Sequence, residues 1–424
     1  MVLDSVYYYQ WDSKTGDWGL YKRYVKYYDS RGNRIEESTF GWNAETNTWK
    51  GSERETWNFD KNGFETEYIR YDWDSKTSTW LGFWRELYTH DERGNRLERT
   101  ACEWDSKNSS WDSTYHDIMT YDTDGHITEL INDRWDKEYP TYRYVYTYNT
   151  GGKLTEEIRY KWNIQTLDWQ WERREVSTIN ADGNKTEEIR YYWNTATSEW
   201  DPDRQTILTY DSIGNLTGES SYDWDPDSSE WVGSNRILYG NDENGNLVEV
   251  TSYYWDTDTG EWNVRIHYML DYDGEGNITE EKRYDWDPVN NEWLAISRIE
   301  YSYDAEGNMT LKVVYGWNSG SGEWVNSFEE VSYWSELITH ISHDLMDTKY
   351  IIYPNPFTDQ AVIKFMDNEI IRKIEVIDVH GRIVKTIDSR IGNIVTIQRD
   401  HLPSGIYLIK IYSDEIFVNK VMIR

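Results

Sequence analysis

Tryptophan is the residue of this sequence with the clearest capacity to bind a ligand. The chain has 25 Trp among 424 residues, and a flat indole ring can stack on a sugar ring or on a cationic group such as choline. Most of these residues recur at a fixed spacing, but Trp57, Trp84 and Trp171 fall outside it. Because the repeats do not need them, these three are the candidate ligand-binding residues. The alternative for the recurring Trp residues is a structural aromatic spine.

Carboxylates offer a second kind of site. Asp225 with Asp227, and Asp256 with Asp258, stand at alternate positions in two polar loops. Alternating oxygen ligands resemble those of calcium loops, although both loops lack the distal Glu of a complete EF-hand. We expect either a structural calcium ion at these loops or acidic residues that only solvate the surface, and no other cofactor.

Catalytic chemistry has no comparable pattern. The eight His residues are scattered, and the one Cys, Cys102, stands where other repeats have Tyr, which favours a packing role over a nucleophile. The Gly-Asn pairs recur as turn residues and do not form a phosphate-binding loop. The sequence therefore predicts a protein that is not an enzyme.

The charge balance disfavours several partners. The chain carries 44 Lys and Arg against 77 Asp and Glu, a formal charge of −33. We expect no nucleic-acid or anionic-membrane partner, because affinity for phosphate backbones depends on clustered Lys and Arg. A single Cys allows no intramolecular disulfide. No apolar run approaches the ~18 residues of a membrane-spanning helix, so no membrane span is expected.

An internal repeat positions the Trp residues. The first Trp of each repeat recurs every 31 residues, with one interval of 27, at Trp11, Trp42, Trp73, Trp104, Trp135, Trp162, Trp193, Trp224, Trp255, Trp286 and Trp317. A second Trp follows seven residues later in ten of these eleven repeats; the repeat at Trp135 lacks it and is four residues shorter. A Gly has the same spacing, at Gly32, Gly63, Gly94, Gly125, Gly152, Gly183, Gly214, Gly245, Gly276 and Gly307.

The residues around each Gly predict a β-hairpin. Asp or Asn stands three residues before every one of these Gly residues, and Asn follows the Gly in seven of ten repeats. Between runs rich in Tyr, Val, Ile and Thr, this pattern is typical of a type I turn that an Asx side chain caps and in which Gly is left-handed. The Trp pair encloses the opposite connection, a longer polar loop pinned by two indoles.

The strand after each Gly carries a column of Glu. Glu is the fourth residue after the Gly in eight of ten repeats, on the face that also carries Tyr and Trp. Stacked Glu side chains repel one another unless solvent, Lys, Arg or a cation intervenes. We expect the turn ends of the hairpins to be solvated and the Trp ends to be packed.

Hairpins of this size cannot each bury a core, so each must lean on its neighbours. The sequence predicts an all-β fold, with an elongated array of about ten tandem 31-residue antiparallel β-hairpin repeats over residues 1–334. The Tyr-Asp-Ser-Arg-Gly-Asn turn at residues 28–33 resembles the tyrosine-aspartate (YD, or Rhs-type) repeats, whose β-hairpins form long curling strips. That resemblance implies an architecture and carries no activity.

The composition changes after residue 334. All 25 Trp residues lie before residue 335, and residues 335–349 are the expected linker. Residues 350–424 hold 10 Lys and Arg against 9 Asp and Glu, in short Ile- and Val-rich runs separated by turn residues. This spacing predicts a small C-terminal β-sandwich.

Four motifs follow one another in this last segment. They are Tyr-Pro-Asn-Pro-Phe at 353–357, Asp-Val-His-Gly-Arg at 378–382, Leu-Pro-Ser-Gly-Ile-Tyr-Leu at 402–408 and Lys-Val-Met-Ile-Arg at 420–424. Together they resemble the type A C-terminal sorting domain of the type IX secretion system of Bacteroidota. The sorting-motif residues are Pro354, Asn355, Pro356, Gly381, Gly405 and Lys420. The resemblance implies export to the outer-membrane surface or medium, with the secretion machinery and a sortase as partners.

The N-terminal residues do not resemble a signal peptide. The opening MVLDSVYYYQWD lacks the basic start and apolar core of a signal peptide. It begins inside a repeat, so we expect a truncated N-terminus.

Two functions remain open. One is a non-enzymatic adhesin or glycan-binding stalk that binds glycans or surface proteins through many weak equivalent sites. The other is a structural or protective surface spacer with no specific ligand.

Overall fold

The computed structural model describes residues 2–134, 140–335, 350–353, 357, 359–365, 370–378, 383–391, 394–403, 405–412 and 416–423. The chain divides into two compact units, Met1–Leu337 and Ile338–Arg424. Each unit is described by itself. A search of the described residues finds no helix with the length and apolar character needed to cross a membrane.

The first unit is a sheet of twenty-two antiparallel strands, each paired with the next along the chain. The strands are β1 (Val2–Asp12), β2 (Asp17–Tyr28), β3 (Arg34–Asn43), β4 (Thr48–Phe59), β5 (Glu65–Asp74), β6 (Thr79–His90), β7 (Arg96–Asp105), β8 (Ser110–Tyr121), β9 (Ile127–Arg134), β10 (Pro140–Tyr148) and β11 (Leu154–Asn163). They continue with β12 (Asp168–Ile179), β13 (Lys185–Asn194), β14 (Glu199–Tyr210), β15 (Leu216–Asp225), β16 (Glu230–Asn241), β17 (Leu247–Asp256), β18 (Glu261–Tyr272), β19 (Ile278–Asp287), β20 (Glu292–Tyr303), β21 (Met309–Asn318) and β22 (Glu323–Ser335).

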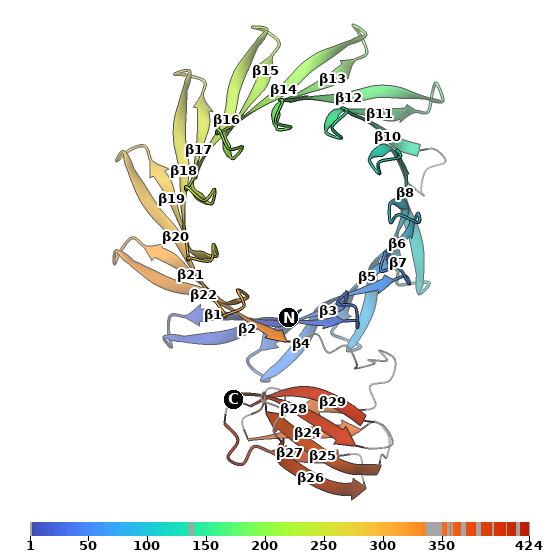
Figure 1. The fold of residues 1–424 in the computed structure, drawn as a ribbon, viewed down its shortest axis with the longest axis vertical. Coiled ribbons are helices and arrows are strands. Elements are labelled where there is room, and N and C mark those ends of the chain that lie inside the picture. The colour runs from blue at the N-terminus through green and yellow to red at the C-terminus, as the bar shows by residue number, and fades with distance from the viewer. Residues whose placement is uncertain are drawn as a thin grey trace. The chain divides into compact units, whose positions relative to one another are not determined.

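This sheet closes on itself. Strand β1 pairs antiparallel with β22, from Val2 opposite Ser335 to Gln10 opposite Phe328, and the strands complete a ring (Figure 1). The all-β class and the antiparallel hairpins are confirmed. The prediction of an elongated array was wrong, and the twenty-two strands make eleven hairpins rather than about ten. Closure pairs the two strands that would otherwise be free edges.

Regular β-bulges give the ring its curvature. The pairing of β5 with β6 shifts register between Arg70 and Tyr71, and the pairing of β4 with β5 shifts between Asn58 and Phe59. Equivalent shifts recur around the ring. Each bulge bends its strand and increases the local twist. The repeated bends therefore add up along the chain until β22 meets β1.

The ring is one sheet thick and buries few apolar side chains fully. In the described part of this unit they are Val6, Tyr7, Tyr88, Ala101 and Cys102. Cys102 is 4% exposed, as expected for a packing residue. Since most domains cover a sheet with a second layer, contacts between neighbouring hairpins must supply much of the stability here.

The Gly turns fold as predicted. In the turn from β6 to β7, the Gly94 N–H donates to the Asp91 carbonyl oxygen at 3.1 Å, and Gly94 has a φ of +90°. The Asp91 carboxylate accepts the backbone N–H groups of Arg93 and Asn95 at 2.8 and 2.9 Å. The Asn95 side chain donates to the same carboxylate at 2.8 Å. This last bond explains why Asn so often follows the Gly.

These turn carboxylates predict a pH dependence of stability. The side-chain amides of Asn95, Asn246, Asn277 and Asn308 hold the pKa values of Asp91, Asp242, Asp273 and Asp304, respectively, below their ordinary range, and backbone N–H groups add to the effect. Because the folded pKa values are lower than the unfolded ones, this stabilisation is present above pH ~4 and is lost as the pH falls through that region. Thermal unfolding of the ring should therefore move to lower temperature below about pH 4.

The chain provides its own control for that measurement. Asn180 caps the same turn in another repeat, where its Oδ1 accepts the N–H groups of Asp182 and Asn184 at 3.0 and 2.9 Å. Replacing Asp91, Asp242, Asp273 and Asp304 together by Asn keeps an oxygen acceptor and removes the titration. This variant should lose less stability on acidification than the wild type, and an equal loss would contradict the assignment.

A tyrosine hydrogen bond ties six of these turns to the preceding hairpin. The Tyr28 hydroxyl donates to the Leu3 carbonyl oxygen and the Tyr272 hydroxyl to that of Leu247, both at 2.8 Å. Equivalent bonds come from Tyr121, Tyr148, Tyr210 and Tyr303. The Tyr that precedes the Asp is therefore a link between neighbouring hairpins.

The second unit has two antiparallel sheets. One contains β23 (Tyr350–Tyr353), β24 (Gln360–Phe365) and β27 (Ile394–Gln398), in the order β23-β24-β27. The other contains β25 (Ile370–Asp378), β26 (Ile383–Ile391), β28 (Gly405–Tyr412) and β29 (Ile416–Ile423), in the order β26-β25-β28-β29. Residues of both sheets form one buried apolar core, Phe357, Ala361, Ile363, Ile374, Val376, Val395, Ile397, Tyr407, Ile409, Ile411, Val421 and Ile423. The finer description as a sandwich stays a prediction.

Candidate functional site: a groove between tryptophan loops

Each loop between paired Trp residues is a short hairpin connection. In the loop from β5 to β6, the Ser78 N–H donates to the Asp74 carbonyl oxygen at 2.8 Å, and the Asp74 carboxylate accepts the Lys76 N–H at 2.9 Å. Ser78 has a φ of +57°. The residue at this position is Gly, Asn or Ser in the other described loops but Leu167 in the loop from β11 to β12.

Leu167 makes its loop a place where stability can be gained. Its φ is +55° and its side chain is 69% exposed, so the strained left-handed backbone is not compensated by burial. Leu167→Gly should raise the free energy of unfolding by about 1 kcal/mol, because a left-handed residue with a Cβ costs about that much. Chemical denaturation measures the change. The reciprocal variant Gly260→Leu, at φ +69°, should lose a similar amount; no difference between the two would contradict the explanation.

The two indoles of each Trp loop pack against each other. All ten pairs are edge-to-face, with ring centroids 5.0–5.2 Å apart. This geometry is favourable for aromatic rings. The recurring Trp residues therefore have the structural role of the aromatic spine.

At three junctions the Trp residues of one hairpin also lean on a glycine of the preceding hairpin. A Cβ built on Gly51 would lie 2.7 Å from two ring carbons of Trp73 and 3.0 Å from Trp80. Gly82 and Gly233 occupy the same repeat position, and a Cβ there would meet Trp104 with Trp111, and Trp255, respectively, at 2.9 Å or less. Glycine at this position lets the indoles of one hairpin rest on the backbone of its neighbour.

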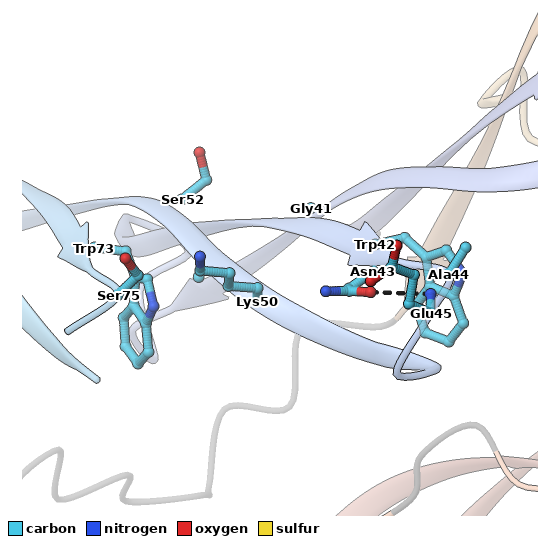
Figure 2. Close-up of a pocket in the computed structure, with 10 residues that line it drawn as sticks. Gly41, Trp42, Asn43, Ala44, Glu45, Lys50, Ser52, Trp73 and Ser75 are labelled. Carbon is cyan, nitrogen blue, oxygen red and sulfur yellow. Dashed lines mark hydrogen bonds between the residues drawn. The ribbon is translucent and has the colours of Figure 1, made fainter. Parts of the chain in front are cut away.

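A groove lies where these hairpins meet at β3, β4 and β5. It has a volume of about 650 Å³, and its lining residues are Gly41, Trp42, Asn43, Ala44, Glu45, Lys50, Gly51, Ser52, Trp73 and Ser75. Trp42 and Asn43 lie at one end and Trp73 and Ser75 at the other, with Lys50 between them (Figure 2). A Cβ on Gly41 would meet no atom within 4 Å. The missing side chain of Gly41 thus leaves this groove open, whereas the rings of Trp73 and Trp80 occupy the place of a Gly51 side chain.

The groove presents hydrogen-bonding groups beside its two indoles. The Asn43 Oδ1 accepts the N–H groups of Glu45 and Thr46 at 3.0 and 3.1 Å. Its amide nitrogen points the other way, toward Lys50 (Figure 2). Lys50, Glu45, Ser52 and Ser75 are exposed. The lining contains one positive and one negative side chain, so the groove carries no strong net charge.

The Glu column is neutralised from within the ring. Arg54 donates to Glu36 at 2.7 Å, Arg85 to Glu67 at 2.6 Å and Arg174 to Glu156 at 2.6 Å. Arg143 with Glu129 and Arg298 with Glu280 make the same pairs, and His267 approaches Glu249 at 2.9 Å. In these repeats a basic side chain relieves the repulsion between the stacked Glu side chains. Glu36 itself is buried. The signal in the sequence was an Arg or His eighteen residues after most of the Glu residues.

The three candidate ligand-binding Trp residues lie in β4, β6 and β12 and have different surroundings. Trp57 stacks near Tyr68, with ring centroids 5.6 Å apart, and the Arg34 guanidinium lies over its ring at 4.2 Å. Trp57 also lines a second, smaller pocket of about 420 Å³ near two Gly turns. Trp171 is the most exposed Trp of the described residues, at 46%. The groove of Figure 2 contains none of the three.

Trp84 belongs to a hydrogen-bonded cluster. Its indole N–H donates to the Glu86 carboxylate at 2.8 Å, which also accepts bonds from Tyr88 and Arg99. Although burial opposes the shift, the bonds from Arg99, Tyr88 and Trp84 lower the pKa of Glu86 to about 2. The polar atom of Trp84 is therefore already used within the protein.

The aspartates of the predicted calcium loops take part in turn hydrogen bonds. The Asp256 carboxylate accepts the Asp258 N–H at 2.9 Å, and the Asp225 carboxylate accepts the Asp227 N–H at 3.0 Å and the Ser228 hydroxyl at 2.7 Å. In the described part of the chain, the group of at least three carboxylate, His or Cys ligand atoms within 4.8 Å of one another is instead Asp122, Asp124 and His126. In that group the Asp122 carboxylate and His126 Nδ1 are 3.0 Å apart.

The sorting-motif residues are described only in part. Pro354, Asn355, Pro356 and Gly381 lie outside the described residues. Gly405 begins β28, and Lys420 lies in β29 opposite Leu408. These two strands pair along their whole length, from Gly405 opposite Ile423 to Tyr412 opposite Ile416.

Comparisons with known proteins match two segments of the chain to families. Residues 263–335 match a family of unknown function, DUF3836, and a search of curated proteins finds no match. Among solved structures, a protein of unknown function from Bacteroides fragilis is 18% identical, with 29% of this chain and 88% of that chain covered and a TM-score of 0.26. A DUF3836 family protein from Parabacteroides distasonis is 22% identical, with 23% and 88% covered and a TM-score of 0.20.

The structure of TcdB2-TccC3 is 11% identical, with 98% of this chain but 26% of that chain covered and a TM-score of 0.37. The resemblance of the turns to YD repeats stays a prediction. Residues 351–424 match the secretion system C-terminal sorting domain. This match supports the resemblance of the C-terminal segment: the chain carries the sorting domain of type IX secretion cargo, which implies contact with that machinery and a secreted or cell-surface location.

Proposed function

We propose that the ring is a non-enzymatic carbohydrate-binding module of an exported surface protein, and that the groove of Figure 2 binds a neutral sugar chain. The observation that carries this proposal is the combination of two indoles with an amide and with exposed hydroxyl, ammonium and carboxylate groups around one open groove. Indole faces bind the apolar faces of sugar rings, and the polar groups can bind hydroxyls. The stalk of the sequence-based hypothesis is replaced by a closed ring.

The proposal that the groove binds and does not hydrolyse rests on its acidic groups. Enzymes that hydrolyse glycosidic bonds use two carboxyl groups placed on either side of the bond. Glu45 is the one carboxylate among the residues that line the groove. The groove is also an open surface feature, and a bound sugar chain would remain in contact with water.

The test is to fill the groove without removing its packing. Tyr192 and Tyr254 occupy the repeat position of Gly41 in other hairpins and are 42% and 44% exposed. Gly41→Tyr should therefore fold normally and place a ring in the groove. A glycan array identifies the glycans that bind, and calorimetry measures their affinity. The variant should bind these glycans at least about tenfold more weakly than the wild type, a loss of about 1.4 kcal/mol in binding free energy.

Gly316→Tyr is the matched control, because Gly316 has the same repeat position and its Cβ would also meet open space. This variant should bind like the wild type. If Gly41→Tyr binds equally well, the groove is not the site. If the folded wild type binds no glycan, the alternative of a structural or protective spacer gains. The ten internally packed Trp pairs favour that alternative.

A further inference from the structure

The hairpin of β11 and β12 departs from the repeat at the position that rests beneath the next Trp pair. Three other hairpins have a glycine at this position, Gly51, Gly82 and Gly233, whereas this hairpin has Trp171. Trp171 lies opposite Tyr160 in the sheet and is 46% exposed. A large, exposed indole therefore occupies a place where the repeat otherwise keeps the backbone bare or carries a smaller side chain.

Trp171 forms a three-indole cluster with the next hairpin. Its ring centroid lies 4.5 Å from that of Trp193, at an angle of 72°, and 5.9 Å from that of Trp200, at 39°. Trp193 and Trp200 pack edge-to-face at 5.2 Å. The cluster joins two hairpins and leaves one indole open to solvent. It lies in other hairpins than the groove of Figure 2, so the inference below goes beyond the proposed function.

At the corresponding junctions of two other repeats, an arginine guanidinium of the protein lies over an indole. The Arg23 guanidinium lies 4.7 Å from the Trp49 ring centroid, and the Arg236 guanidinium 4.6 Å from that of Trp262. In both repeats the Glu column is interrupted, by Ser5 and Gly218. Where the Glu is present, the Arg pairs with it instead, as Arg174 does with Glu156 at 2.6 Å.

At the Trp171 cluster the equivalent arginine is Arg174. Because it pairs with Glu156, it does not lie over an indole. In the described part of the chain, no Lys or Arg side chain stacks on Trp171, Trp193 or Trp200. Residues 163–168 and 194–203 at this junction contain no Lys or Arg. They contain four carboxylates, all in β12 and β14 beside the two loops: Asp168, Glu199, Asp201 and Asp203. One of these carboxylates, Asp203, pairs with Arg190. Indoles in a negative surrounding attract a cation through both the ring quadrupole and the charge.

We propose that the Trp171 cluster binds a quaternary or methylated ammonium group, as found in choline or in methylated lysine. A neutral sugar would gain nothing from the carboxylates. A protonated primary amine would lose more hydration on reaching the rings than a methylated ammonium, whose methyl groups contact the indole face. The ammonium group of phosphocholine fits the rings equally well, but its phosphate is repelled by these carboxylates of β12 and β14.

Saturation-transfer NMR on the full chain tests this proposal with choline chloride as the probe. The choline methyl signal should show saturable transfer that weakens as the salt concentration rises. The uncharged isostere 3,3-dimethylbutan-1-ol should bind several-fold more weakly, and Trp171→Gly should reduce affinity for choline about tenfold. Trp171→Phe should retain part of the binding, because a phenyl ring is a weaker cation acceptor than an indole.

Two further arms identify the source of the group. A peptide with trimethyllysine should bind at least as well as choline, and phosphocholine should bind more weakly than choline; the reverse order would point to a lipid headgroup. Trp57→Phe, at a Trp already covered by Arg34, is the matched control and should bind like the wild type. Equal binding of choline and the uncharged isostere, or unchanged binding by a folded Trp171→Gly variant, would overturn the proposal. Gly41→Tyr should leave choline binding intact, which separates this result from that of the sugar groove.

Discussion

A Val6→Pro variant should open the ring. Val6 is 4% exposed and lies between two neighbours, opposite Tyr24 in β2 and Ser332 in β22. Proline removes a backbone donor and its ring is tolerated only at edges and bulges. The lost bond and the unpaired acceptor should cost roughly 2–4 kcal/mol. Because β1 closes the sheet, this loss should fall on the closure, and β22 should become a free edge.

Hydrogen exchange of the backbone amides measures that opening. Amides of β22 and β2 should exchange faster, and the variant should self-associate through its exposed edges at high concentration. Leu20→Pro is the matched control. Leu20 lies opposite Tyr9 beside a register shift, as Pro202 does opposite Tyr191 in the wild type. The control should keep its protection. Unchanged protection of β22 in Val6→Pro would mean that the β1–β22 pairing does not hold the ring closed.

The hairpins were predictable because their signals are local. Asp or Asn, two further residues and Gly specify a turn whose hydrogen bonds lie within five residues, as between Asp91 and Asn95. The spacing of Trp42 and Trp49 likewise specifies a loop that the two indoles clamp. Such local bonds depend on residue type and spacing alone, and both can be read from one sequence.

Ring closure was not predictable from the same pattern. A repeat tells how each hairpin is built, but not the small rotation from one hairpin to the next. That rotation comes from the bulges, such as the shift between Arg70 and Tyr71, and from the twist they add. The increments of the eleven hairpins add up so that the last strand reaches the first, whereas a slightly smaller sum would give an open array. The pairing of Val2 with Ser335 therefore depends on a sum that no single repeat contains.

The groove of Figure 2 escaped prediction for a related reason, whereas Trp171 was among the predicted ligand-binding residues. The groove depends on a missing side chain, that of Gly41, at a position that varies between repeats. Trp57, Trp84 and Trp171 could be selected from the sequence because their large side chains interrupt the pattern, whereas a missing side chain gives no such signal. One of them, Trp84, donates its N–H to Glu86 two residues along the same strand. The same carboxylate accepts from Arg99 in the neighbouring strand, a contact that depends on strand register.

Ile374→Ala should destabilise the C-terminal unit without affecting the ring. Ile374 is 0% exposed and lies in the shared core of the two sheets. Truncating a fully buried Ile removes burial and leaves a cavity, at a cost of about 3–4 kcal/mol. Ile383→Ala, at 56% exposure, is the matched control and should change stability by less than about 0.5 kcal/mol.

The distribution of Trp makes the two units separately observable. All 25 Trp residues precede residue 335, so Trp fluorescence reports only the first unit, while amide exchange in β24, β25, β28 and β29 reports the second. In Ile374→Ala the amides of the second unit should lose protection while the fluorescence transition stays in place. A joint shift of both signals would mean that the units unfold together, and no shift of either would mean that Ile374 is not a core residue. Because the sorting domain occupies this unit, the same variant should also accumulate less outside the cell than Ile383→Ala.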